Sequence, residues 1–302
     1  MLKSVKLAEE SRTRYIDECP GINRTDIQIA LSLGPFGASL PTTQEYDGFY
    51  PPPYGPKEYS TDGVNCNAFD DNGDATRKSI GALESFHFER LNVFACNPES
   101  WKTIDYVAFE TVPLVREVKA IRKAMARLQE EFVKQGRGAD YMKPWWISHT
   151  FPDGQFPEVE RPGGPKLSAR QIVVGALEKK QDTDNGGVHD LVPTGLGINC
   201  TNLRFLRLHV AKMGLEMANL SDKNTRRPFL VIYPSGGEVY DPISRSWNLE
   251  DGEETNSEVW AEELCSVVMA IAKEDIWDGI LVGGCCRVGP EKIRALSEIL
   301  NL

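Results

Sequence analysis

The sequence predicts an α/β protein organised around a parallel β-sheet, and two patterns carry this prediction. Six short apolar runs alternate with longer stretches in which apolar residues recur at three- and four-residue steps. Apolar strands between amphipathic helices are typical of a parallel sheet covered by helices. Six such strands could form an open doubly wound sheet or six of the eight strands of a (β/α)8 barrel. No GxGxxG or P-loop pattern follows any strand, which disfavours a nucleotide-binding version of the open sheet.

The expected elements follow one another along the whole chain. The first is a helix from Leu2 to about Glu18, which Pro20-Gly21 ends. The expected strands are short and apolar, and they span 26–32, 104–109, 145–148, 196–199, 229–233 and 280–282. Further helices are expected over about 75–91 and along the apolar stripes that start at Leu114, Val173, Leu203, Val259 and Ile293.

Three long polar loops interrupt this pattern, at about 42–74, 151–167 and 234–256. Loops of this length are usually functional or disordered, and a plain surface insertion is an equally open interpretation of the Pro-rich part of the first. No internal repeat and no clear linker divides the chain. We therefore expect residues 1–302 to form a single domain.

Composition and charge restrict the class of protein. The net charge is −10 and no basic cluster occurs, so nucleic acid is not an expected partner. No apolar run approaches the roughly 20 residues that a membrane span needs, and the amino-terminal residues lack the apolar core of a secretion signal. Seven cysteines in a chain of this length do not suggest a disulfide scaffold. We expect a cytoplasmic protein whose clustered thiols bind a metal or act in catalysis.

Chemistry in parallel α/β folds collects at the carboxyl ends of the strands. Those ends carry polar or reactive side chains, namely Ser32, Glu110, His149, Cys200, Tyr233, Cys285 and Cys286. The pair Cys285-Cys286 follows Gly283-Gly284 and precedes a helix start, and Cys200 lies in an equivalent place. Three thiols at two strand ends of one sheet could therefore meet on one metal ion.

Zinc is the ion that this donor set favours. Three protein ligands and one open position are typical of catalytic zinc. Such an ion would suit a substrate thiol as a further ligand, because coordination removes the thiol proton near neutral pH. The resulting thiolate is a nucleophile for a methyl group carried on a cationic donor.

Other interpretations of these residues stay open at this point. Vicinal cysteines are often small buried residues, and a dithiol redox pair is disfavoured because adjacent cysteines bridge only with strain. Ser32 could be a turn hydroxyl, Glu110 could stabilise a helix dipole, and His149 could be a buried histidine behind the site. The remaining cysteines have no partner motif and are interpreted as structural, namely Cys19, Cys66, Cys96 and Cys265.

Several motifs together resemble the homocysteine S-methyltransferase family. They are Gly197-Ile-Asn-Cys200, Gly283-Gly-Cys-Cys-Arg287, Ser32 to Ala38 with Glu45 to Gly48, Phe109 to Pro113, and Tyr233 to Glu238. The resemblance implies a (β/α)8 TIM-type barrel and Zn2+ held by Cys200, Cys285 and Cys286. It further implies transfer of a methyl group from a sulfonium or betaine donor to L-homocysteine, which gives L-methionine. It places the homocysteine amino group on Glu110, and Asn199 is expected to orient the substrate through its side-chain amide or its backbone.

The sequence also departs from the family pattern. The family begins with a strand carrying Asp-Gly-Gly and a second βα unit, so we expect a barrel lacking its first two βα units, with two open sheet edges. Ser235-Gly236 replaces the family's Asn-Ser, and Val288-Gly289 replaces its threonines. A degenerate, non-catalytic zinc- or amino-acid-binding member of the same fold is the alternative. The motifs leave the donor open among S-methylmethionine, S-adenosylmethionine and betaine.

Overall fold

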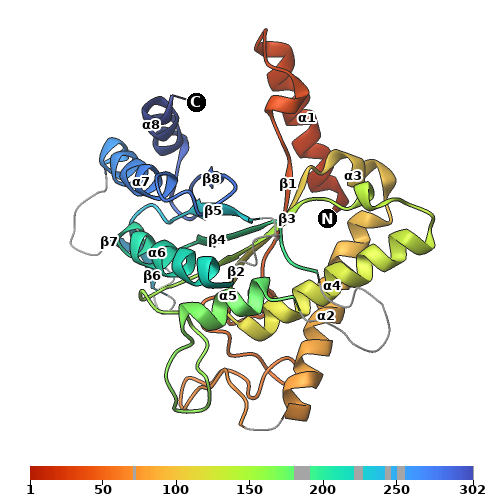
Figure 1. Cartoon of the computed structure of the whole chain (residues 1–302), viewed down its shortest axis with the longest axis vertical. Coiled ribbons are helices and arrows are strands. Elements are labelled where there is room, and N and C mark those ends of the chain that lie inside the picture. Colours follow the sequence, from red (N-terminus) through yellow and green to blue (C-terminus); the bar gives the residue numbers. More distant parts are fainter. Residues whose placement is uncertain (71–72, 180–190, 221–226, 242–245, 250–255, 302) are drawn as a thin grey trace.

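A computed structural model describes residues 1–70, 73–179, 191–220, 227–241, 246–249 and 256–301. Its centre is a six-stranded parallel sheet with the order β1-β2-β3-β4-β5-β8 (Figure 1). The strands span Ala30–Leu33, Tyr106–Val112, Trp145–His149, Gly195–Asn199, Phe229–Tyr233 and Ile280–Val282. The predicted parallel α/β class with six main strands is therefore confirmed.

The order of the strands in space follows their order in the chain. An open doubly wound sheet reverses its strand order at a switch point, and this sheet does not. Within the described residues β1 and β8 each have one neighbouring strand. At the β8 edge Leu281 keeps 38% of its surface exposed.

Helices surround the strands in an arc that runs from α8 through α7, α6 and α5 to α4 (Figure 1). The helices span Leu2–Glu18 (α1), Gly73–Ala95 (α2), Pro98–Thr103 (α3), Val115–Lys134 (α4), Ala169–Leu177 (α5), Leu203–Leu220 (α6), Ser257–Ala272 (α7) and Pro290–Leu300 (α8). None of the described helices combines the length and the apolar character needed to cross a membrane.

The two faces of the sheet differ because successive side chains of a strand point to opposite faces. One face packs into the main core with the helices and includes Phe109, Ile147 and Ile232. The other face carries a smaller cluster of Ala108, Trp146 and Val231, against which Tyr106, Phe229 and Tyr233 pack. The chemistry described below lies on this second face, at the carboxyl ends of the strands.

Three parts of the chain differ from the sequence-based expectation. The first strand begins at Ala30, because Arg24–Asp26 form a 3-10 turn closed by a capping box between Asn23 and Asp26. The helix α3 was not predicted, although Asn97 caps it by accepting a hydrogen bond from the Ser100 N–H and Pro98 occupies its first turn.

The third difference concerns the expected loop at 234–256. It contains an antiparallel pair of strands, β6 (Glu238–Asp241) and β7 (Ser246–Leu249). Residues 242–245 and 250–255 of that loop lie outside the described residues, as do 71–72 of the loop at 42–74. Apart from the first two residues of α2, the described parts of 42–74 and 151–167 contain no helix or strand beyond an isolated bridge between Val159 and Lys166.

Candidate metal centre and substrate site

Three cysteine side chains meet at the carboxyl end of the sheet. Cys200 follows β4, whereas Cys285 and Cys286 follow β8, so they come from the two strands that flank β5. The Sγ atom of Cys286 lies 3.5 Å from that of Cys200 and 3.9 Å from that of Cys285. The sulfur atoms of Cys200 and Cys285 are in direct contact, as in a disulfide bond, and the Cα atoms of the two residues lie 5.6 Å apart.

This cluster can hold a metal ion. Among the described His, Cys, Asp and Glu residues, these three are the group whose ligand atoms all lie within 4.8 Å of one another. A bridge between two sulfur atoms does not require a third thiol within 4 Å of both, which is where Cys286 lies. Three thiols around one point instead form a donor set for a thiophilic metal.

The turn after β5 holds the two adjacent cysteines in place. The backbone N–H of Cys285 donates to the carbonyl of Pro234 at 2.9 Å, and the N–H of Gly236 donates to the carbonyl of Cys286 at 2.8 Å. A Cβ atom on Gly236 would lie 2.3 Å from the carbonyl oxygen of Arg287. Only glycine fits this close approach, so the turn in this chain depends on Gly236.

Asn199, the last residue of β4, lies directly below the sulfur cluster and is fully buried. Its Oδ1 accepts from the Thr111 N–H at 2.8 Å and lies 2.8 Å from Ser148 Oγ. Its Nδ2 donates to Thr111 Oγ1 at 2.7 Å and to Cys285 Sγ at 3.8 Å. The side chain therefore joins one cysteine to the ends of β2 and β3.

A chain of hydrogen bonds continues from Ser148 to Glu110. Ser148 Oγ lies 2.6 Å from Tyr233 Oη, which donates to Glu110 Oε2 at 3.1 Å. Ser32 Oγ donates to the other carboxylate oxygen. Burial, together with the Glu110 carboxylate, holds the pKa of Tyr233 well above its ordinary value, so its hydroxyl stays protonated. Glu110 and Cys285 are thus the two ends of one polar network.

The structure brings together most of the predicted strand-end residues. Ser32 and Glu110 bond to each other rather than to a turn or to the start of a helix. His149 points to the opposite face, where its ring packs on Phe156 and its Nδ1 lies 3.0 Å from the Val112 carbonyl. Burial lowers the pKa of His149 to about 4, so the ring is neutral at physiological pH. Cys265 is buried inside α7, as expected of a structural cysteine.

Sequence reasoning missed three residues of this region. Ser148 and Thr111 belong to the network around Asn199, and Tyr46 places its hydroxyl oxygen 3.9 Å from Cys286 Sγ. Strand alternation puts Ser148 on the face of Trp146 and His149 on the opposite face, but it does not tell which of the two faces carries the site. No local pattern could have placed Tyr46, which reaches the cluster from the first long loop.

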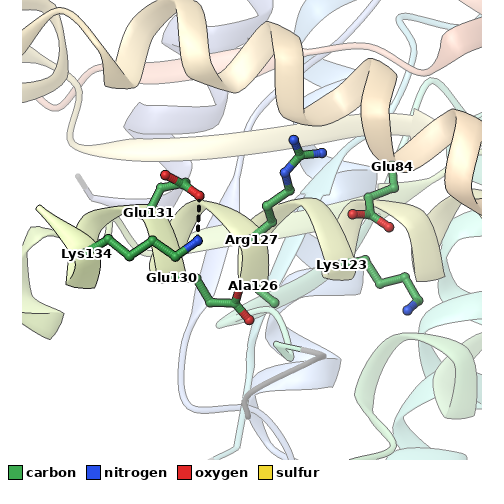
Figure 2. A pocket seen from close by; sticks show the side chains of 7 residues that line it. All are labelled: Glu84, Lys123, Ala126, Arg127, Glu130, Glu131 and Lys134. Carbon is green, nitrogen blue, oxygen red and sulfur yellow. Dashed lines mark hydrogen bonds and ion pairs between the residues drawn. The ribbon is translucent and has the colours of Figure 1, made fainter.

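A surface groove between α2 and α4 carries no comparable chemistry (Figure 2). Alternating charges line it, from Glu84, Lys123, Arg127, Glu130, Glu131 and Lys134. Lys134 Nζ pairs with Glu131 at 2.9 Å on the exposed helix surface, and the Arg127 guanidinium covers the Phe88 ring. These contacts are those of a solvated helix face.

Comparison with known proteins agrees with the geometry. The sequence model of the family described as homocysteine S-methyltransferase matches residues 1–300. Homocysteine S-methyltransferase 3 of Arabidopsis thaliana is 28% identical over 309 residues, covering 99% of this chain and 67% of the plant protein. Selenocysteine Se-methyltransferase of Brassica oleracea var. italica is 30% identical over 304 residues, covering 99% of this chain and 66% of that protein. The chain thus spans about two thirds of the length of these relatives.

A bacterial relative and a solved structure extend this comparison. Homocysteine S-methyltransferase YbgG of Bacillus subtilis (strain 168) is 26% identical over 302 residues, covering 97% of this chain and 68% of that protein. The crystal structure of the homocysteine methyltransferase MmuM from Escherichia coli, in its metallated form, aligns with a TM-score of 0.55 and 23% identity. The alignment covers 99% of this chain and 69% of MmuM. At this identity the match shows a shared fold.

Proposed function

Because this chain belongs to the homocysteine S-methyltransferase family of enzymes, we propose that it methylates the thiol of L-homocysteine and forms L-methionine. The observation that carries the proposal is the cluster of Cys200, Cys285 and Cys286, joined through hydrogen bonds to Glu110. A thiol-binding centre and a carboxylate for an ammonium group are the two features that homocysteine requires.

We infer that the ion is zinc and that the three cysteines hold it as thiolates. In a tetrahedral site with Zn–S bonds of about 2.3 Å, the sulfur atoms lie roughly 3.8 Å apart. The distances of 3.5 Å and 3.9 Å that Cys286 makes to its partners agree with this spacing, whereas the sulfur atoms of Cys200 and Cys285, which are in direct contact, would have to move apart around the ion. Bound zinc would supply a Lewis acid that takes the substrate thiol as a further ligand and favours its thiolate form.

The side chains around the cluster would bind and orient the substrate. Glu110 is our proposed anchor for the ammonium group, and the hydroxyls of Ser32 and Tyr233 fix the position of its carboxylate. Asn199 remains a predicted substrate-orienting residue. Because its amide already contacts Thr111, Ser148 and Cys285, we propose that it acts through the position of Cys285 or through its backbone.

For the fold, we propose a (β/α)8-type barrel that lacks its first two βα units. Two observations support this: the strand order runs without reversal, and the main core packs the helices against one face of the sheet. The second face, which carries Ala108, Trp146 and Val231, would then line the inside of the barrel. Two further βα units would pair with β1 and β8.

A direct assay tests the proposed function. The zinc-loaded protein is incubated with L-homocysteine and, in separate reactions, S-methylmethionine, S-adenosylmethionine and betaine, and methionine is measured. Methionine formation with at least one donor supports the proposal and identifies the donor. Zinc and homocysteine binding without methionine formation would instead support the non-catalytic alternative.

A further inference from the structure

Tyr46 reaches the sulfur cluster from outside the sheet. It belongs to the first long loop, and its Oη lies 3.9 Å from Cys286 Sγ. Its side chain is half-buried, so part of it stays accessible next to the cluster. The hydrogen-bonded network toward Glu110 leaves the cluster from a different ligand, Cys285. Tyr46 therefore contacts a different cysteine of the cluster from the one that is linked to Glu110.

The loop holds Tyr46 in a fixed position. On its amino-terminal side, the Gln44 N–H donates to the Gly37 carbonyl at 2.9 Å, and a Cβ on Gly37 would lie 2.4 Å from the Gln44 backbone. On its carboxyl-terminal side, Tyr50 is fully buried and its hydroxyl donates to the buried Glu117 carboxylate at 2.7 Å. Anchors on both sides leave Tyr46 little freedom to move away from the cluster.

The residue before Tyr46, Glu45, carries a carboxylate with one unpaired oxygen. Glu45 Oε2 is buried and has no hydrogen-bond partner in the described part of the chain. Burial raises the pKa of Glu45, a hydrogen bond from its own backbone N–H opposes this rise, and the nearby Asp47 adds to it. A buried carboxylate oxygen without a partner is unfavourable, and a cation brought by a ligand would compensate it. Consecutive residues of the loop thus carry an unpaired carboxylate oxygen and an aromatic ring, and both kinds of group attract onium cations.

We propose that Tyr46 and Glu45 bind the positively charged group of the methyl donor, a sulfonium or quaternary ammonium cation. This inference rests on the proposed function and assigns to the first long loop the recognition of the second substrate. Homocysteine would be held through Glu110, and the donor would enter from the side of Cys286.

The charge change of the reaction fits such a site. During transfer the bond between the donor sulfur or nitrogen and its methyl carbon breaks, and its electron pair stays with the leaving thioether or amine. The homocysteine sulfur forms the new bond to the methyl carbon, and the thiol proton passes to solvent. The donor loses its onium charge, so a site built on attraction to that charge binds the product more weakly than the substrate.

The test measures donor binding separately from catalysis. S-methyl-L-methionine and betaine, one sulfonium and one quaternary ammonium compound, are titrated by calorimetry into zinc-loaded wild type, Tyr46→Ala, Tyr46→Phe and Glu45→Gln. Tyr46→Ala should weaken binding of the wild type's preferred donor about 3- to 30-fold, and Glu45→Gln should weaken it by a similar factor. Tyr46→Phe keeps the ring and should stay within about 2-fold of wild type.

Two controls limit the interpretation. First, zinc content and homocysteine affinity should be unchanged in all variants. Second, Tyr59→Ala changes a tyrosine of the same loop whose ring is stacked on Phe49, and this variant should bind the donor as wild type does. Unchanged donor affinity in Tyr46→Ala would overturn the inference. Zinc loss in both Tyr46→Ala and Tyr46→Phe would also overturn it, because the hydroxyl would then be needed to hold Cys286 in position. Failure of the proposed function is a different result, because wild type would then form no methionine with any donor.

Discussion

Cys200 and Cys286 follow strands that are not neighbours in the sheet, yet their Sγ atoms lie 3.5 Å apart. β5 separates the two strands, and its turn at Pro234 to Gly236 bonds to the backbone of the adjacent cysteines. An ion shared by these thiols would connect the edge strand β8 to the interior of the sheet across β5. The metal would thus support both the fold and the chemistry.

The purified protein should contain about one zinc per chain, and Cys286→Ala should release it. Two remaining thiolates leave a tetrahedral ion with too few protein ligands to compete with a chelator. Metal analysis after dialysis measures this, with the exposed Cys96→Ala as the matched control. Full zinc retention in a triple variant of Cys200, Cys285 and Cys286 would show that the ion is bound elsewhere.

Replacing Glu110 by Gln should weaken homocysteine binding about 10- to 100-fold, because a charge-assisted hydrogen bond contributes roughly 1.5–3 kcal/mol. Zinc content should not change, since the carboxylate contacts Ser32 and Tyr233 and not the cysteines. Calorimetry with L-homocysteine measures the affinity. Glu131→Gln, which removes an exposed ion pair with Lys134, is the control. Equal affinities of wild type and Glu110→Gln would argue that this carboxylate only supports the network.

The turn that holds the adjacent cysteines should be sensitive to a single added side chain. Gly236→Ser places a Cβ where only 2.3 Å separates it from the Arg287 carbonyl, so the turn and Cys286 must shift. Zinc affinity should fall about 10- to 100-fold, the range seen when groups that orient metal ligands are lost. Gly279→Ser is the control, because its Cβ would meet nothing within 4 Å. A Gly236→Ser protein with wild-type zinc affinity would show that the turn adapts.

Acid should destabilise the protein through His149. Its pKa in the folded state is lowered to about 4 from an ordinary value of 6.5. Above pH 6.5 the ring is neutral in both states, and its contribution to stability is fully present. As the pH falls through 6.5 the unfolded state takes up the proton first, so stability is lost between about pH 6.5 and 4.

The size of this effect can be measured by difference. About 1.4 kcal/mol per pKa unit gives a loss of up to roughly 3 kcal/mol from this one side chain. Urea unfolding at pH 7, 5.5 and 4.5 is compared between wild type and His149→Gln, which cannot take up the proton. The variant should show the shallower loss of unfolding free energy. Identical slopes would mean that His149 binds its proton equally in both states.

The sheet and the cysteine cluster can both be predicted from the sequence alone, for physical reasons. Parallel strands covered by helices must be apolar throughout, and this makes them visible as short runs between amphipathic stretches. Cys200 and Cys285-Cys286 stand directly after two such runs. Because carboxyl ends of parallel strands share one edge of the sheet, their meeting could be predicted from position alone.

The rest of the site depends on information that no local pattern carries. His149 stands at the end of its strand and attracts attention, but the inward residue is its neighbour Ser148, because strand side chains alternate. Choosing between them requires the register of the neighbouring strands, which the structure supplies. Tyr46 comes from a loop whose path is fixed by the distant pair Tyr50 and Glu117. The motif Glu45 to Gly48 marks this segment in the sequence, but the contact of Tyr46 with Cys286 depends on tertiary structure.

The origin of the three thiols from two separate strands has a consequence for how the protein is made. Cys200 and Cys285 are 85 residues apart in the chain. A ribosome that adds roughly 5–20 residues per second would expose Cys200 about 4–17 seconds before Cys285 follows. During that interval the first thiol has no partners to share an ion with. The proposed zinc ion could therefore bind to all three thiols only after Cys285 and Cys286 have been made.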